Sequence, residues 1–249
     1  MIVTAIVNQR FMPPVVKTVE PDVRTSHMLR CFAGARENWL CLLIVFFYSF
    51  DFLTFESCVA PYVDRVLGIT PATLGLYFLA ATGSYVLTSP VWARLADACR
   101  NPYPMMAACI LTVTVGTLII PPSPLLGLAP RWWLFGLGMT LQEAFFGGAY
   151  IPCFQQMLQA SVRRGLPDDL HTHAFVSSVY WSVYSLGTVV GPVSGGLLVD
   201  SFGFPVMMTC VAALTLLLFL LTLAQAVATS CRGDSRPADV TDERECAPA

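Results

Sequence analysis

Six long apolar segments alternate with short polar links along this chain. Each segment is long enough to cross a bilayer, which takes about 20 helical residues. The segments cover residues 39–63, 72–96, 104–122, 132–158, 174–199 and 205–228. The links, such as "DACRNPYP" (97–104), hold most of the charge and several prolines. Because such short links join neighbouring antiparallel helices, the pattern predicts an all-α membrane protein built as a compact six-helix bundle.

A soluble helical protein with a strongly apolar core is the alternative. The run "TCVAALTLLLFLLTLA" (209–224) argues against it, since a water-facing helix needs a polar stripe. Composition agrees: only 12% of residues are charged and the mean hydropathy is +0.65. A soluble domain has about 25% charged residues. The chain is therefore expected to lie in a membrane.

The distribution of polar and apolar segments predicts three regions of the chain. Residues 1–38 are expected to form a cytosolic linker, 39–229 the six-helix bundle, and 230–249 a disordered cytosolic tail. If the amino-terminal tail is cytosolic, all but two of the 14 Lys and Arg residues fall on the cytosolic side. The exceptions are Arg65 and Arg131, and this asymmetry predicts that both termini are cytosolic.

Several kinds of chemistry are not expected. A net charge of −2 without a basic stripe excludes a nucleic-acid partner. The nine cysteines show no C-x-x-C spacing, and His171 and His173 lie on one short polar link with too few ligands for a metal. We find no phosphate-binding loop or nucleophile elbow, so no enzyme activity, cofactor or metal is predicted.

Three acids interrupt the apolar segments. Asp51 and Glu56 lie in the first segment, and Glu143 lies beside Gln142 in the fourth. Charged groups in a membrane usually face the bundle interior or a water-filled path, where they bind substrate or protons. Five helical residues turn through about 140°, so Asp51 and Glu56 cannot share one face. Glu56 is the main candidate and Glu143 the second, whereas Asp51 is expected chiefly at a helix interface.

Aromatic residues accompany these acids. They are common as packing residues, but rings that line a cavity can also hold an ammonium group by cation–π contact. The candidates, with Gln142, are Tyr48, Phe55, Tyr150, Tyr180, Trp181 and Tyr184.

The fifth segment carries a row of small residues. Gly187, Gly191 and Gly195 recur every four residues, which lets another helix backbone approach closely. Pro192 interrupts the hydrogen-bond ladder and allows a bend. Gly196 extends the motif, which predicts a packing face with a bend in it.

The link after the second segment resembles the loop signature of the major facilitator superfamily. Leu95, Ala96 and Asp97 match it, whereas Ala93 replaces a usual glycine and Asn101 begins a departure from the usual glycine–basic pair. The resemblance implies a latch in which Asp97 pairs with Arg100 in one conformation of the transporter and releases it in another.

Three stretches extend this resemblance over residues 39–228. "TFESCVAPYV" (54–63), "GGAYIPCFQQML" (147–158) and "SVYSLGTVVGPVSGGLLVDSFGFP" (182–205) resemble helices seven, ten and eleven of the vesicular amine transporters (solute carrier 18). Gly147, Gly148 and Trp181 stand where monoamine members carry acids, which favours the polyamine branch. The resemblance implies proton-coupled antiport of organic cations into vesicles.

A facilitator needs two six-helix halves, and this chain resembles the carboxy-terminal one. "MIVTAIV" (1–7) would then be the end of a preceding helix. We expect either a truncated sequence or a short isoform, with a half-size transporter acting as a dimer as the alternative. The expected partners are an organic cation, protons, lipid, and the missing half or a second chain. A non-transporting half-length partner of a full-length carrier is the other hypothesis.

Overall fold

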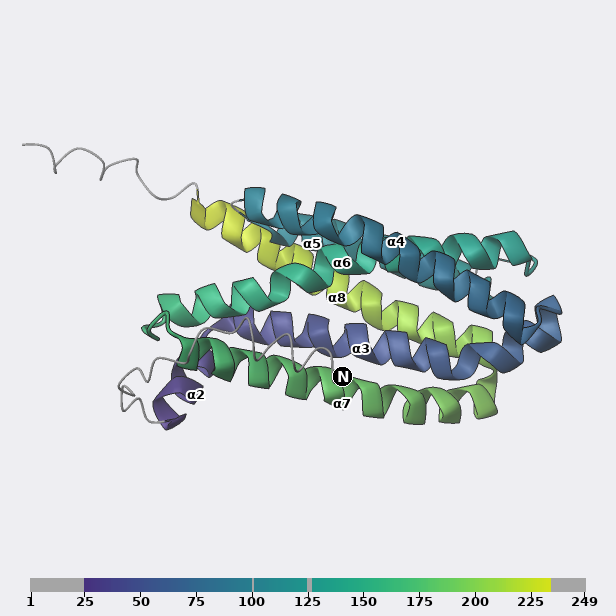
Figure 1. Ribbon diagram of the computed structural model, residues 1–249, viewed down its shortest axis with the longest axis horizontal. Coiled ribbons are helices and arrows are strands. Elements are labelled where there is room, and N and C mark those ends of the chain that lie inside the picture. The colour runs from purple at the N-terminus through teal and green to yellow at the C-terminus, as the bar shows by residue number, and fades with distance from the viewer. Residues whose placement is uncertain (1–24, 100, 125–126, 234–249) are drawn as a thin grey trace, which may run out of the picture.

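The computed structural model describes residues 25–99, 101–124 and 127–233, with the side chains of 25–26 and 231–233 left out (Figure 1). All the regular structure in this part of the chain is helical. The elements are α2 (Thr25–Gly34), α3 (Arg36–Tyr62) continued by η1 (Val63–Leu67), α4 (Pro71–Ala98), α5 (Tyr103–Ile119), α6 (Trp132–Arg163), α7 (Leu170–Phe202) and α8 (Phe204–Gly233). The predicted fold class is confirmed.

The six long helices run along one common axis and pack as pairs (Figure 1). α3 packs along α7, α4 along α6 and α5 along α8, while α6 also packs against α3 and α5. In Figure 1, α4 and α7 form the upper and lower edges of the bundle, with α3 and α8 visible between them. The helices of the middle are therefore covered by neighbours, and those at the edges are not.

Within the described ranges, four helical stretches are long and apolar enough to cross a membrane: α3 with η1, α4, α7 and α8. α5 has only 17 residues and counts as a shorter apolar helix. α6 has 32 residues but includes a buried glutamine and a half-buried glutamate in its middle. The four spans differ in how much of their apolar stretch is buried inside the bundle. The buried share is 11% for α4 and 17% for α7, whereas it is 50% for α3.

The segment before the bundle is partly structured. Residues 25–38, expected to be part of a water-exposed linker, instead contain α2 and the start of α3. Met28 and Phe32 of α2 are buried, and Phe32 packs edge-on against Phe175 of α7. A short apolar stripe, too short to register as a membrane segment, is enough to fold this helix onto the bundle. The rest of the linker, residues 1–24, lies outside the described residues.

The glycines of α7 lie against α3. A Cβ added to Gly191 would stand 2.7 Å from the backbone oxygen of Phe50, and one added to Gly195 would stand 2.5 Å from Cγ2 of Thr54. Gly187 faces Ser49 in the same way. The two backbones approach closely only because these positions carry no side chain. α3 and α7 therefore form one tightly packed pair.

Hydrogen bonds join α4 to α6. The hydroxyl of Thr88 and the indole nitrogen of Trp92 both donate to the backbone oxygen of Ala144, at 2.9 and 2.7 Å. One turn earlier, Ser84 donates to the backbone oxygen of Thr140. Such bonds between helices stabilise a bundle in lipid, where apolar contact with a neighbouring helix offers little over contact with acyl chains.

Interior prolines occur in only some of the helices. Pro61, Pro90, Pro152 and Pro192 lie inside α3, α4, α6 and α7 respectively. Within the described residues, α5 carries proline only in its first turn, and α8 has its one proline, Pro205, at its second position. A proline inside a helix removes one backbone hydrogen bond and favours a bend.

The start of α7 is capped. The carboxylate of Asp169 accepts a hydrogen bond of 2.8 Å from the backbone amide of Thr172. This bond, which the charged form of the acid accepts, lowers the pKa of Asp169 below its ordinary value. The cap begins α7 four residues before the apolar segment that the sequence predicts.

Candidate functional site

Asp51 is buried in the middle of the bundle. Its side chain is 1% exposed, and its Oδ2 accepts a hydrogen bond of 2.9 Å from Nε2 of Gln142 on α6. Its other oxygen, Oδ1, is buried and finds no hydrogen-bond partner among the described residues. The pair thus joins α3 to α6, which agrees with the interface position expected for Asp51, while one oxygen stays unsatisfied.

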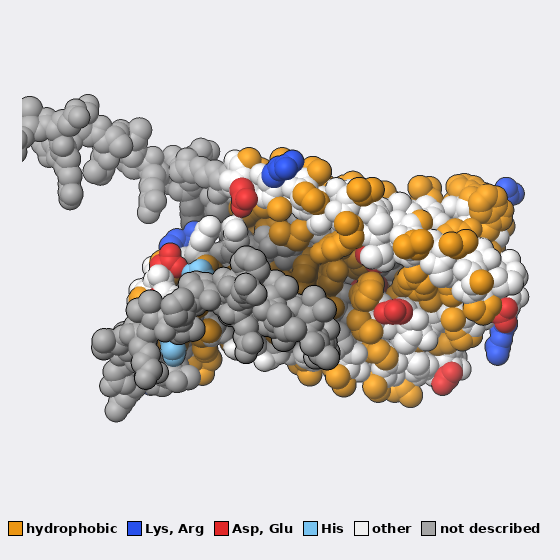
Figure 2. Space-filling model, viewed as in Figure 1, with side chains coloured by type: hydrophobic (Ala, Val, Ile, Leu, Met, Phe, Trp, Pro, Cys, Tyr) orange, Lys and Arg blue, Asp and Glu red, His pale blue; other side chains and the backbone are white. Residues whose placement is uncertain are grey.

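The other two acids lie progressively closer to the surface. Glu143, beside Gln142, is half-buried, and Glu56 is exposed. Glu143 lies close enough to both Asp51 and Glu56 to interact with each of them electrostatically. Figure 2 shows acidic side chains halfway along this face, between the helices at its edges, while the other charges gather at the two ends. Solvent exposure therefore decreases from Glu56 through Glu143 to Asp51.

No cation balances these acids among the described residues. The two salt bridges in that part of the chain lie at one end of the bundle: Arg163 with Glu37 at 3.8 Å, and His173 with Asp168 at 2.8 Å. Acids in the apolar middle of a membrane bundle are costly unless a cation or a proton accompanies them. The site is therefore suited to bind positive charge.

Aromatic rings from α3, α6 and α7 form a continuous cluster beside the acids. Tyr48 stacks on Tyr150 with a centroid distance of 4.2 Å. The chain of rings continues to Tyr180 at 5.5 Å and through Trp181 to Tyr184 at 5.3 Å. Tyr184 also lies near enough to Glu56 to interact with it electrostatically. Five of the six aromatic candidates are thus brought together.

Tyr85 of α4 belongs to the same region and was not predicted. It interacts electrostatically with Glu143 and Tyr184, and its ring lies beside Gly147 of α6. The sequence gives one usable signal: Tyr85 precedes Thr88 and Trp92 by about one and two turns, on the α4 face that meets α6. We call the three acids, the five clustered rings and Tyr85 the acidic face.

The remaining candidates lie elsewhere. Phe55 is buried in a separate cluster and contacts Phe78 and Phe204 at centroid distances of 6.1 and 6.4 Å. Asp97 is exposed at the end of α4. Its expected partner, Arg100, lies outside the described residues, so the latch stays a prediction.

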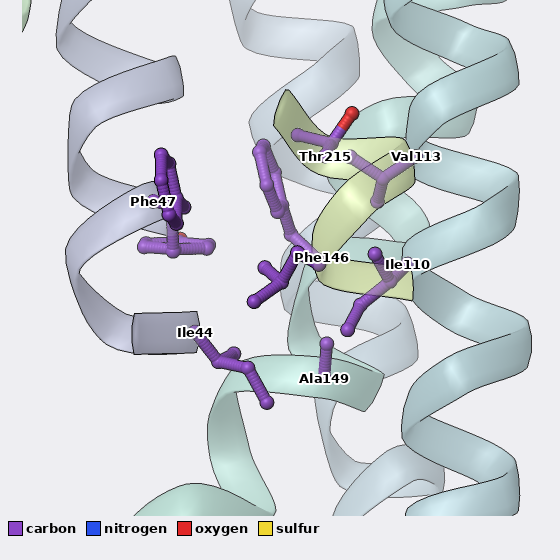
Figure 3. A pocket seen from close by; sticks show the side chains of 9 residues that line it. Ile44, Phe47, Ile110, Val113, Phe146, Ala149 and Thr215 are labelled. Carbon is purple, nitrogen blue, oxygen red and sulfur yellow. The ribbon is translucent and has the colours of Figure 1, made fainter. Parts of the chain in front are cut away.

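A small apolar pocket lies behind the acidic face, between α3, α5, α6 and α8 (Figure 3). It is partly open to the surroundings and has little room beyond that of a single small group. Phe146 points into the space in Figure 3. Tyr48 lines the pocket and also belongs to the aromatic cluster, since its ring contacts both Phe146 and Tyr150. The lining residues are Ile44, Phe47, Tyr48, Ile110, Val113, Phe146, Ala149, Thr215 and Leu218. Most of these side chains are apolar, so the lining suits an apolar group.

Replacing Gln142 by leucine is expected to destabilise the bundle by about 1–3 kcal/mol. The substitution removes the only donor to Asp51 among the described residues and leaves both carboxylate oxygens unsatisfied. Unfolding of the purified chain in detergent measures the effect. Gln155→Leu, at an exposed position on the same helix, is the control and should change stability little. Equal stability of the two variants would contradict the assignment.

The loop before α7 offers little for a metal. His173 Nε2 lies 2.8 Å from Oδ1 of Asp168, a contact exposed to solvent. Across the described ranges, no three His, Cys, Asp or Glu residues gather in a way that would hold a metal ion. The acidic face is therefore the main candidate site.

Comparisons with known proteins all match this chain to membrane transporters. The family model of the Major Facilitator Superfamily matches residues 41–241. A rat protein named MFS-type transporter SLC18B1 is 26% identical over 182 residues, and its human counterpart is 29% identical over 159 residues. A multi-drug resistance efflux pump PmrA homolog from Lactococcus lactis is 33% identical over 175 residues.

The matches cover most of this chain but a minor part of each relative. The aligned region takes up 69% of the chain and 40% of the rat protein, 62% and 34% for the human one, and 67% and 39% for the bacterial one. The chain thus spans about two-fifths of the length of the curated relatives it matches.

Proposed function

Because the chain belongs to the major facilitator superfamily, a family of membrane transporters, we propose that it is one half of a secondary active transporter that exchanges protons for an organic cation. It is an integral, multi-pass membrane protein. The observation that carries the proposal is the acidic face: three acids without a cationic partner in the described residues, beside a cluster of aromatic rings. The carboxylates and rings of the acidic face could bind either protons or ammonium groups, one after the other.

The exchange follows from competition for the carboxylates. Glu56, exposed on the open face, would bind either a proton or an ammonium group, with Tyr184 close by for a cation–π contact. Glu143 would extend the binding region inward. Asp51, held by Gln142, would be the innermost proton acceptor, since its Oδ1 has no hydrogen-bond partner in the part of the chain that the structure describes.

We infer that the substrate carries more than one positive charge. Two acids, Glu56 and Glu143, lie close enough to repel each other, and Tyr184 and Tyr85 interact with them electrostatically. An amine with two or more ammonium groups would neutralise both, which agrees with the resemblance to the polyamine branch of the vesicular amine transporters. We therefore propose polyamines, or related amines, as cargo for an endomembrane vesicle, with both termini of the chain in the cytosol.

The acidic face also supports the need for a second half. An exposed glutamate in the middle of an apolar bundle cannot face lipid without a large cost. α4 and α7, which form the edges of the bundle in Figure 1, are the least buried of the candidate membrane spans. A second six-helix unit laid across these edges would close a water-filled path over Glu56. Transport would then proceed by rocking of the two halves around the site.

Uptake into acidified proteoliposomes tests the proposal. We expect a form of the chain fused to a six-helix amino-terminal half to take up a labelled polyamine only when the vesicle interior is acidic. Uptake that ignores the pH gradient would contradict antiport. If the fused form transports and the purified chain neither transports nor dimerises, the alternative that the chain is a non-transporting partner of a carrier is favoured.

A further inference from the structure

A polar groove lies at the end of the bundle where α3 begins and α6 and α8 end. It encloses about 820 Å³ of space that is partly open to solvent. No residue of the acidic face lines it. The lining residues are Arg36, Glu37, Arg164, Gln225, Ala228 and Thr229.

The groove carries an excess of positive charge. Glu37, its one acid, pairs with Arg163 at 3.8 Å, while neither Arg36 nor Arg164 is in a salt bridge with a described residue. Nη1 of Arg164 reaches the end of α2, where it lies 3.6 Å from the place that a Cβ on Gly34 would take. Two like charges from different helices thus line one hollow. An anion between them would relieve their repulsion.

The start of α3 favours an anion as well. Ala35 has no side chain that could cap the helix, and in the described part of the chain the amides of Arg36 and Glu37 have no side-chain acceptor, whereas the amide of Asn38 donates to the backbone oxygen of Ala35. Amides at the start of a long helix attract negative charge, and phosphate groups bind there readily. Gln225 and Thr229, one turn apart on α8, add polar side chains to the lining of the groove.

An apolar stripe runs from the groove toward the middle of the bundle. Leu221, Leu217 and Leu214 of α8 follow Thr229 and Gln225 at steps of three or four residues, so they share one helix face. These leucines are exposed by 44%, 53% and 36% respectively. A surface with a cationic polar end and an apolar length has the shape of a phospholipid.

The groove also lies at the level expected for lipid headgroups. Trp39, one turn after Arg36 on α3, is 57% exposed, and its indole nitrogen donates to the backbone oxygen of Ala33 at 2.9 Å. Exposed tryptophan is typical of the boundary between headgroups and acyl chains.

We propose that this groove binds an anionic phospholipid, with its phosphate between Arg36 and Arg164 and an acyl chain along the leucines of α8. The site is separate from the acidic face and independent of the transported substrate. A lipid bound there would join the start of α3 to the ends of α6 and α8.

Titration with phosphatidylglycerol tests the proposal. We expect the lipid to raise the Tm of the purified full chain in uncharged detergent micelles, and phosphatidylcholine to have no such effect. In Arg36→Gln/Arg164→Gln, the lipid concentration that gives half the shift should rise about thirtyfold, since each arginine near an anionic lipid surface contributes about fivefold to the affinity and the two contributions multiply. Each single variant should show a smaller rise.

Arg94→Gln is the matched control, because Arg94 is an exposed arginine near the end of α4 that does not line the groove. It should keep the wild-type response. An undiminished response in the double variant and in both single variants would overturn the proposal. A shift of equal size from inorganic phosphate alone would also overturn it, because the groove would then bind a soluble anion and the leucine stripe would have no role.

Discussion

Glu56→Gln is expected to reduce pH-driven uptake of a labelled polyamine to the level of empty vesicles, in the chain fused to a six-helix amino-terminal half. Glutamine keeps the size of the side chain but removes both its charge and its proton site. Because Glu56 is the most exposed acid of the acidic face, it is the first that proton and substrate would reach. Folding should be unaffected, since the side chain is not buried.

Two matched variants make this experiment specific. Glu56→Asp keeps the carboxylate and should retain part of the uptake. Asp64→Asn removes an exposed acid from η1, outside the acidic face, and should leave uptake unchanged. Uptake by Glu56→Gln at the rate of the unmodified protein would refute the role of Glu56.

Gly191→Val is expected to give the largest loss of stability, on the order of 3 kcal/mol, because overpacking a close contact costs about 1–3 kcal/mol and at times more. A Cβ at this position would lie 2.7 Å from the backbone oxygen of Phe50 and 2.7 Å from Oγ1 of Thr54. One of these two obstacles is backbone, which cannot rotate out of the way, so α3 and α7 must move apart. Unfolding of the purified chain in detergent, followed by circular dichroism, measures the loss.

Gly196→Val is the control for this substitution. Gly196 lies in the same helix, and a Cβ there would meet nothing within 4 Å. Both glycines are helical, so the change in helix propensity is the same in the two variants. A similar loss of stability in both would show that propensity, and not the approach of α3, sets the cost.

Hydropathy predicts the long helices well because a membrane segment has to be apolar over its whole length, which leaves a strong local signal. The angular position of a residue around its helix likewise predicts which of the acids in α3 is buried. The 140° between Asp51 and Glu56 anticipates that one is buried at an interface and the other exposed. These are properties of a single helix, which a sequence displays directly.

What the sequence does not display is the partner across a helix interface. The bond from Gln142 to Asp51 and the approach of Tyr85 to Glu143 depend on how α3, α4 and α6 are placed relative to each other. Phe55 illustrates the same limit: it is one residue from Glu56, yet it packs in a different cluster. α2 was missed because its apolar stripe is short and its stability comes from contact with the bundle.

The distribution of interior prolines has a mechanical consequence. Each of Pro61, Pro90, Pro152 and Pro192 leaves one backbone oxygen in its helix without the usual amide donor, and the four helices concerned are those that supply the acidic face or pack along it. α5 and α8, packed together, keep unbroken ladders beyond their first turns. The α5–α8 pair is therefore expected to be the stiffer part of the bundle. The four helices with interior prolines can bend more easily, so that binding of a cation would bend these helices while α5 and α8 keep their position in the bilayer.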